Sequence, residues 1–394
     1  MKKLLASHIF LGIIFLSLVC LAFGREKFVR PDPSYDESKV PAYTLPDPLV
    51  MENGEPVKNA AMWMEKRRPE ILGLFEKHVY GRMMAGRPEK MTWKVTSEDP
   101  NAMNGKAISK TVMLYFDGRE DGPSMQMDMT LPKTDKPVPV FMLAQWGKAM
   151  PEVLDRGYGM IICRETQIQP DKWDTYSESI RAFFSPPGQT EAKPDEWGAI
   201  GVWAWGLSRA MDYVETDRDI DAKRVCLQGF SRFGKTVMWA GARDPRFAMT
   251  FSGDSGCGGA ALVRREFGET VYMITGARPY WFCGNFKTYG KRVNELPVDW
   301  HELIALYAPR PVYIATADED LWGDPYGSFL AAKAAEPVYK LFSKTGLGVD
   351  AQPPVDTPVG DFIGYHNRKG KHDQNAYDWQ QYLNFADRHL KKDI

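Results

Sequence analysis

The 394-residue sequence has almost no charge bias, few cysteines and, beyond its first 24 residues, no long apolar segment. Its 50 basic and 51 acidic residues leave a formal net charge of −1, which gives no indication of nucleic-acid binding. Five cysteines are too few to build a fold from disulfides, and none has the spacing of a metal site. We therefore expect a monomer with neither nucleic acid nor membrane as a partner.

The first 24 residues combine two early lysines, a short apolar segment and small residues before Arg25. This pattern is typical of a secretory signal peptide and is too short for a lasting membrane span. Cys20 could instead be the lipidated cysteine of a lipoprotein, but Val19 stands where a small residue is expected. We expect residues 25–394 to form one exported domain, secreted or periplasmic.

The N-terminal third of the mature chain shows three patterns. Residues 25–55 are rich in proline and polar residues, which predicts an extended arm around the body. Residues 60–80 place apolar side chains at helical spacing. Apolar and polar residues alternate in 91–95, 107–116 and 125–131, so these segments predict an antiparallel sheet edge.

From residue 137 onward, short and continuously apolar segments alternate with helical ones. The predicted strands are 138–144, 159–163, 224–228, 247–252 and 312–316. The predicted helices are 151–156, 197–215, 234–242, 327–341 and 378–390. This alternation predicts a three-layer αβα sandwich with a mostly parallel central sheet. The long loop 167–196 interrupts it, and such loops are usually lids or site walls.

Ser231 lies between a predicted strand and a predicted helix, in the segment Gly229-Phe-Ser-Arg-Phe-Gly234. A nucleophile elbow needs small residues here because the chain reverses with a strained backbone. The usual elbow has glycine two residues either side of the serine, whereas this chain has Phe233 at the later position. The segment favours an α/β-hydrolase fold with Ser231 as nucleophile. A surface serine on an ordinary turn is the alternative.

A catalytic serine needs a base to accept its proton and an acid to orient that base. In this fold the chain order is serine, acid, histidine. His372 lies between a glycine-containing turn and the last helix, and we favour it over His366. Asp320 follows strand 312–316, where the fold usually places its acid, and Asp254 follows the preceding strand. Spacing does not decide between these two acids.

Several motifs resemble the glucuronoyl esterases, carbohydrate esterase family 15. The resemblance runs from about residue 62 to 390 and is densest in GFSRFGK, GDSGCGGAALVRREFGET, YWFCGNF, HELIALYAPRP and DLWGDPYG. Arginine directly after the nucleophile is the distinctive feature. One departure is Phe230, because the family usually has cysteine or histidine there. Phe230 and Asp373 leave no disulfide of the fungal kind, which points to a bacterial-type member, and Cys257 could pair with Cys283 instead.

The resemblance implies roles for the catalytic residues. Ser231 would be the nucleophile and His372 the base, while Arg232 would supply its backbone N–H and guanidinium to the oxyanion. The family acid commonly lies on the loop that holds Asp254, but some members rely on the position of Asp320. We favour Asp254 slightly.

The resemblance also implies substrate contacts. Lys235 and Glu269 would bind sugar hydroxyls, and Trp322 would pack on the uronate ring. Without the resemblance, Lys235 would be read as a solvated helix residue, Glu269 as a surface charge and Trp322 as core packing.

The expected reaction is hydrolysis of 4-O-methyl-glucuronoyl esters that link glucuronoxylan to lignin alcohols, without a cofactor or a metal. A xylan acetyl esterase or a broad-specificity carbohydrate ester hydrolase is the alternative within the enzymes. A catalytically silent carbohydrate-binding protein is the alternative from another class.

Overall fold

The computed structural model describes residues 28–84, 86–144 and 147–391. The predicted signal peptide, residues 1–24, and the alternative lipidation site at Cys20 lie outside the described residues. No helix in the described part of the chain is long and apolar enough to span a bilayer.

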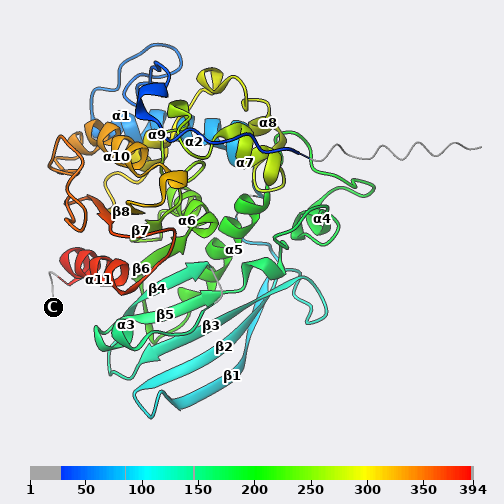
Figure 1. Cartoon of the computed structure of the whole chain (residues 1–394). Helices are drawn as coiled ribbons and strands as arrows, with labels where there is room; N and C mark the ends of the chain where they lie inside the picture. Colours follow the sequence, from blue (N-terminus) through cyan, green and yellow to red (C-terminus); the bar gives the residue numbers. More distant parts are fainter. Residues whose placement is uncertain (1–27, 85, 145–146, 392–394) are drawn as a thin grey trace, which may run out of the picture.

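Nine strands form one sheet in the order β1-β2-β3-β5-β4-β6-β7-β8-β9 (Figure 1). The first three strands are antiparallel and join β5 antiparallel, whereas β5, β4 and β6 to β9 run parallel to one another. The predicted antiparallel edge and parallel core are both confirmed. The strands are β1 (Thr92–Ala102), β2 (Ala107–Tyr115), β3 (Ser124–Pro132), β4 (Val138–Ala144), β5 (Gly159–Cys163), β6 (Ile220–Phe230), β7 (Met249–Gly253), β8 (Val312–Ala317) and β9 (Ile363–Arg368).

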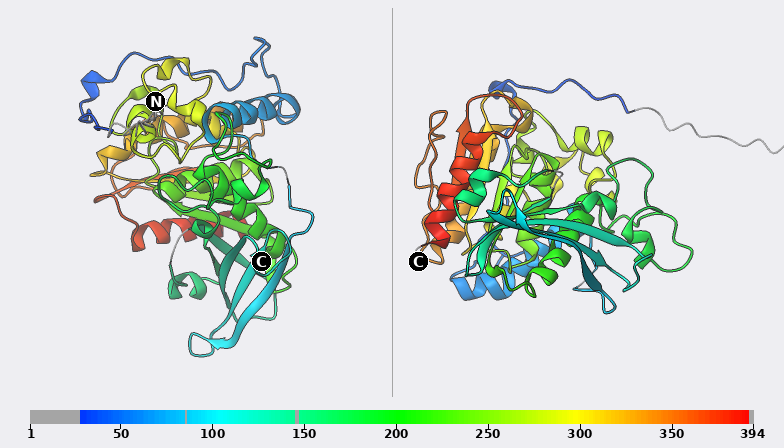
Figure 2. Two further views of the ribbon diagram at one scale, coloured as in Figure 1. Left: turned by 90° about the vertical axis from the view of Figure 1, so that its right-hand side faces the viewer. Right: turned by 90° about the horizontal axis from the view of Figure 1, so that it is seen from below.

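Helices cover both faces of this sheet (Figure 2). The helices α3 and α11 pack on one face around Phe141, whereas α5, α6, α9 and α10 belong to the other layer. The helices are α1 (Ala60–Met62), α2 (Arg68–Phe75), α3 (Pro151–Asp155), α4 (Ile180–Phe184), α5 (Ala199–Val214), α6 (Arg232–Arg243), α7 (Val271–Ala277), α8 (Gly284–Lys287), α9 (Trp300–Ala305), α10 (Pro325–Lys340) and α11 (Ala376–Leu390). The predicted αβα layering is confirmed.

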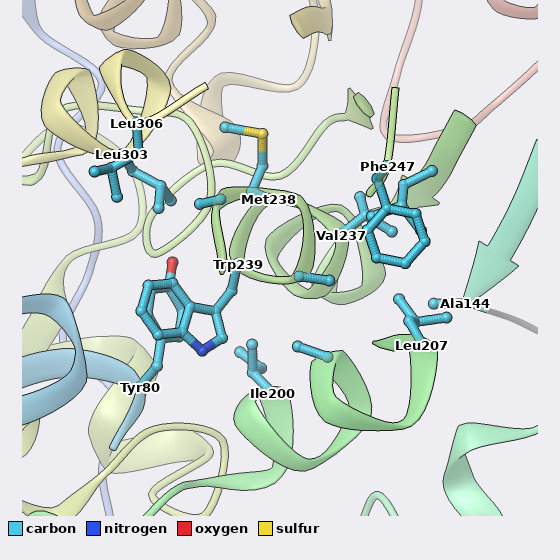
Figure 3. Close-up of a cluster of buried hydrophobic side chains, with 14 of the residues drawn as sticks. Tyr80, Ala144, Ile200, Leu207, Val237, Met238, Trp239, Phe247, Leu303 and Leu306 are labelled. Atoms are coloured by element: carbon cyan, nitrogen blue, oxygen red, sulfur yellow. The ribbon is translucent and has the colours of Figure 1, made fainter. Parts of the chain in front are cut away.

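Helix α6 is almost entirely buried, and Figure 3 shows the side chains around it. Its Trp239 is fully buried and stacks on Tyr80, with ring centroids 4.5 Å apart. Ile200 and Leu207 of α5 lie on one side of α6, and Leu303 of α9 lies on another. Because α6 begins directly after Ser231, this packing holds the position of that serine.

The prediction that Cys257 and Cys283 could pair is wrong. Both cysteines are free thiols and buried, as are Cys163 and Cys226. Cys283 Sγ lies 3.8 Å from the Lys77 carbonyl, and the Cys257 carbonyl accepts a hydrogen bond from another part of the fold. Each cysteine is therefore held by different neighbours.

The start of helix α5 is joined to the segment that follows α7. The N–H groups of Ala199 and Ile200 donate to the carbonyls of Tyr280 and Trp281, at 2.8 and 3.0 Å. Gly198 precedes them, and a Cβ there would lie 2.5 Å from the Trp281 oxygen. These contacts satisfy N–H groups that have no partner within the helix.

We predict that Gly198→Ala destabilises the protein by about 1–3 kcal/mol, because the new methyl group would clash with backbone that is already hydrogen-bonded. Urea unfolding measures the change. Gly73→Ala in α2 is the matched control, since no atom lies within 4 Å of its added Cβ. That control should stabilise the helix by about 0.5–1 kcal/mol. Equal stability of Gly198→Ala and the wild type would contradict this account.

Candidate active site

Ser231 lies on the predicted sharp turn between β6 and α6. Its backbone has φ 57° and ψ −125°, a conformation that L-residues rarely adopt. Its N–H donates to the Gly253 carbonyl at 2.8 Å. A Cβ at Gly229 would lie 2.2 Å from the Phe233 oxygen, and one at Gly234 would lie 2.8 Å from the Ser255 Cβ. Both glycines are therefore required by close approach.

The irregular glycine spacing has a structural explanation. Phe233 is buried against Trp203, with ring centroids 5.6 Å apart, so this position serves the core. The close contact with the β7 loop falls one residue later, at Gly234. The second glycine of the motif is accordingly displaced by one position.

Four neighbouring parallel strands each carry one candidate residue just after their carboxyl ends. Ser231 follows β6, Asp254 follows β7, Asp320 follows β8 and His372 follows β9. Ligands of open α/β sheets bind at this edge. All four residues line one pocket of about 410 Å³.

His372 is oriented by Asp320. The His372 Nδ1 lies 2.7 Å from Asp320 Oδ2, and Asp320 is buried. The Phe230 ring packs against the imidazole, with centroids 4.7 Å apart. A proton on Nδ1 that is shared with the carboxylate leaves Nε2 able to accept the serine proton.

Asp254 lies beside this pair, with a carboxylate oxygen within 4.8 Å of both residues. Its carboxylate is buried and lies 3.4 Å from the Arg368 guanidinium. Burial, and then the charge of Asp320, raise the pKa of Asp254 to about 8. A carboxyl that is neutral at pH 7 stabilises an imidazolium poorly. The hydrogen bond to His372 comes from Asp320, so the geometry favours Asp320 as the orienting acid over the slight sequence preference for Asp254.

His366 has a different environment. It lies within β9 with no exposed surface, its Nε2 is 3.0 Å from Asp378, and its Nδ1 is 3.0 Å from the Tyr313 hydroxyl. Both ring nitrogens thus have partners within the core. The geometry agrees with the choice of His372.

Asp254, Asp320 and His372 also offer one ligand-type atom each within 4.8 Å of one another. Among the described residues, this is the group that could hold a metal ion. Two of these residues, His372 and Asp320, are already joined by a hydrogen bond.

Arg232 is held by an ion pair with Asp171. Its Nε lies 2.7 Å from Asp171 Oδ2, and its guanidinium lies over the Phe233 ring at 4.5 Å. The other oxygen of Asp171 accepts hydrogen bonds from the Tyr280 hydroxyl and the Trp281 indole, at 2.9 and 2.8 Å. Asp171, on the long predicted loop, thus holds the arginine that follows the nucleophile.

The three predicted substrate contacts are brought together in the pocket. Lys235 is buried, and its Nζ donates to the carbonyls of Ser255 and Cys257 at 2.5 and 2.7 Å. It lies 3.8 Å from a Glu269 oxygen. The Glu269 N–H donates to the Trp322 carbonyl at 2.9 Å, and burial raises the pKa of Glu269. The alternative of a solvated Lys235 is wrong.

Comparisons with known proteins show the family of this chain. The family model "Glucuronyl esterase, fungi" matches residues 117–343. A glucuronoyl esterase from Solibacter usitatus is 42% identical, covers 90% of this chain and all of its own, and superposes with a TM-score of 0.86. The chain belongs to the glucuronoyl esterases, carbohydrate esterase family 15. The predicted family and the α/β-hydrolase fold are confirmed.

Other members of the family differ in how their activity is described. A structure titled a promiscuous CE15 esterase, from a marine bacterial metagenome, is 42% identical over 91% of this chain and all of its own, with a TM-score of 0.83. Carbohydrate esterase MZ0003, from an unknown prokaryotic organism, is 42% identical and covers 91% of this chain and 92% of its own. A 4-O-methyl-glucuronoyl methylesterase of Wolfiporia cocos is 27% identical, over 85% and 82%. The greater likeness to bacterial structures agrees with the predicted bacterial type.

Several residues that line the pocket were not identified from the sequence. Arg30, Ser255, Gly256, Trp281 and Gly323 line the pocket beside the predicted residues. Trp281, Ser255 and Gly256 lie in motifs that carry the family resemblance, and these motifs could have identified them as pocket residues. Arg30 lies in the N-terminal arm, where no motif or spacing indicated a site.

We predict that Asp320→Asn lowers kcat on the order of 10⁴-fold, because the amide no longer fixes the histidine tautomer. Steady-state kinetics measure the loss. Asp254→Asn is the matched control and should retain most of the activity, since its carboxyl is already neutral. A larger loss for Asp254→Asn would return the orienting role to Asp254.

The raised pKa of Asp254 predicts a pH-dependent stability. Asp254 ionises near its ordinary pKa in the unfolded chain and near 8 in the folded protein. Between about pH 4 and 8 the folded state holds a proton that the unfolded state has released, so this contribution falls as pH rises. Asp254→Asn removes the linkage and should gain stability relative to wild type by up to about 1.4 kcal/mol per pH unit. The measurement is denaturant unfolding of the wild type and Asp254→Asn at several pH values. If the free energies of unfolding of the two proteins changed in parallel with pH, this prediction would be refuted.

Proposed function

We propose that this protein is a serine esterase that hydrolyses 4-O-methyl-glucuronoyl and glucuronoyl esters, with Ser231 as nucleophile and His372 as base. The supporting observation is the hydrogen bond between His372 and Asp320 in the pocket that Ser231 lines. A serine, a histidine and a buried carboxylate are the groups that acyl transfer requires. Family membership supports the choice of acyl group.

The reaction follows from the positions of these side chains. His372 Nε2 accepts the hydroxyl proton as Ser231 Oγ attacks the C6 carbonyl carbon. The resulting oxyanion is stabilised by the backbone N–H of Arg232 at the start of α6, together with the Arg232 guanidinium. The imidazolium returns its proton to the departing alcohol. Water then hydrolyses the acyl-enzyme by the same steps and releases the uronic acid.

Lys235, Glu269 and Trp322 give the pocket its selectivity for a sugar acid. Two carbonyls hold the Lys235 ammonium in place, so that a third N–H can reach a sugar hydroxyl. Glu269 offers acceptor oxygens, and the Trp322 indole offers an apolar face. A pocket built of fixed hydrogen-bonding groups discriminates strongly against substrates that leave them unpaired.

The substrate in this proposal is the ester between glucuronoxylan and lignin alcohols. Such a polymer lies outside the cell, so the proposed export of the chain fits this substrate. An acetyl or broad-specificity esterase would use the same serine and histidine but would gain little from Lys235 and Glu269.

We predict that the wild type hydrolyses benzyl glucuronate with a higher kcat/KM than 4-nitrophenyl acetate. Ser231→Ala should lose activity on both esters by on the order of 10⁶-fold in kcat. Glu269→Gln should lower kcat/KM for the glucuronate by about tenfold or more, because one charged hydrogen bond weakens, while hydrolysis of the acetate stays within about twofold.

The matched control is Glu295→Gln, which removes an exposed carboxylate outside the pocket. It should leave both rates unchanged. Faster turnover of the acetate, with equal effects of Glu269→Gln on the two esters, would favour the broad-specificity alternative. Unchanged activity of Ser231→Ala would refute the mechanism.

A further inference from the structure

The N-terminal arm is attached to the wall of the pocket by several separate contacts. The Phe28 ring lies on Gly276, where a Cβ would be 2.2 Å from the ring, and packs against Tyr272 with centroids 5.6 Å apart. The Ser34 carbonyl accepts a hydrogen bond from the Gly268 N–H at 2.9 Å. The segment is therefore positioned on Gly268, directly before Glu269, and on α7, which begins two residues after Glu269.

Two linked ion pairs hold the arm at a later position in the chain. Glu37 lies 2.6 Å from Arg265, and Arg265 in turn lies 2.8 Å from Asp324. Asp324 begins α10 and follows the short turn Leu321–Gly323, which carries Trp322. The arm is thus connected both to the Glu269 segment and to the Trp322 loop.

These contacts place Arg30 in the catalytic pocket. Its guanidinium lies over the Trp322 ring, 4.9 Å from the centroid. Among the described residues, no carboxylate forms an ion pair with it. A guanidinium stacked by one face keeps its five N–H donors, which point along its edge, available to a ligand.

Arg30 also lines a second and larger cleft, of about 1420 Å³, together with Phe28, Tyr272 and Arg278. The catalytic pocket itself has about 410 Å³, near the lower end of the range of about 300–1,000 Å³ for small-molecule sites. One sugar ring fits such a volume, but a polymer does not. The part of the substrate beyond the uronate must leave the pocket past its walls, and Arg30 stands where the pocket and the cleft meet.

We propose that Arg30 is a specificity-determining residue that binds hydroxyl and ring oxygens of the glycan to which the uronate is attached. This inference rests on the proposed function. Arg30 lies over Trp322, which is assigned to the sugar ring, whereas the leaving alcohol is protonated by His372. The glycan and the alcohol are joined to different ends of the uronate. The position of Arg30 therefore favours the glycan as its ligand.

The test compares two benzyl esters, one of glucuronic acid alone and one of glucuronic acid linked to xylotriose. Arg30→Ala should raise KM for the xylotriose-linked ester about tenfold or more, as expected for lost hydrogen bonds to a charged donor. The KM for the monosaccharide ester should rise less than about threefold, and kcat should stay unchanged for both. Arg30→Lys should recover only part of the loss, because an ammonium lacks the planar stack.

Two further variants separate binding from structure. Lys39→Ala removes an exposed cation of the same arm, outside both cavities, and should leave both KM values unchanged. Phe28→Ala removes the ring that packs on Gly276 and Tyr272 and so weakens the attachment of the arm. It should reproduce part of the rise in KM caused by Arg30→Ala. Equal KM changes for the two esters, or none with Arg30→Ala, would overturn the inference.

A binding measurement distinguishes failure of this inference from failure of the proposed function. Calorimetric titration of Ser231→Ala with the free xylotriose-linked glucuronic acid, with and without Arg30→Ala, requires no turnover. Absence of hydrolysis by the wild type would reject the proposed function, whereas equal affinities of the two proteins would reject the role of Arg30.

Discussion

The strained backbone at Ser231 is the constraint on which the site depends. A positive φ at a serine persists only where the surroundings hold it, and here they do so from both sides. The Gly253 carbonyl fixes its N–H, and the close approach at Gly229 and Gly234 leaves no room for a relaxed turn. Helix α6 completes the restraint, because its buried Trp239 is stacked on Tyr80. The nucleophile is thus presented by a turn that is anchored in the buried core.

Two buried carboxyls lie close together in the pocket. Burial, and then the nearby charge of Asp320, raise the pKa of Asp254 to about 8. The Asp320 carboxylate lies 2.7 Å from the His372 Nδ1, and the Phe230 ring packs on the imidazole. The family resemblance implies that fungal members hold the catalytic histidine with a disulfide. In this chain the Phe230 ring packs on His372 instead. Packing is a weaker restraint than a covalent bond, and the His372 side chain keeps 42% of its surface exposed.

The sequence predicted the strands and helices of the core well, because continuous apolar segments and helical periodicity are local signals. It did not predict β9, since the strand places His366, Asn367 and Arg368 in the interior, where partners such as Asp378 replace apolar character. Strand β6 begins four residues earlier than predicted, at Ile220 rather than at residue 224. Polar residues can continue a strand once its neighbours pair with it. The choice between Asp254 and Asp320 was undecidable from spacing, since both follow neighbouring strands. Only the path of the loop after β9 brings His372 to one of them. Arg30 could not be found, because its role depends on contacts of a proline-rich arm with residues more than 200 positions away.

The substrate-binding residues proposed for the pocket contact one another, although they lie far apart in the sequence. The Trp322 carbonyl accepts the Glu269 N–H, its ring carries Arg30, and Glu269 lies near the Lys235 ammonium. A change at one of these positions therefore alters the placement of the next, and the free energies of substitution should not add. Lys235 also holds the carbonyls of Ser255 and Cys257, in the loop against which Gly234 packs. The substrate-facing side of the pocket and the backbone that presents Ser231 are consequently one connected structure, in which selectivity for the acyl group and placement of the nucleophile depend on the same contacts.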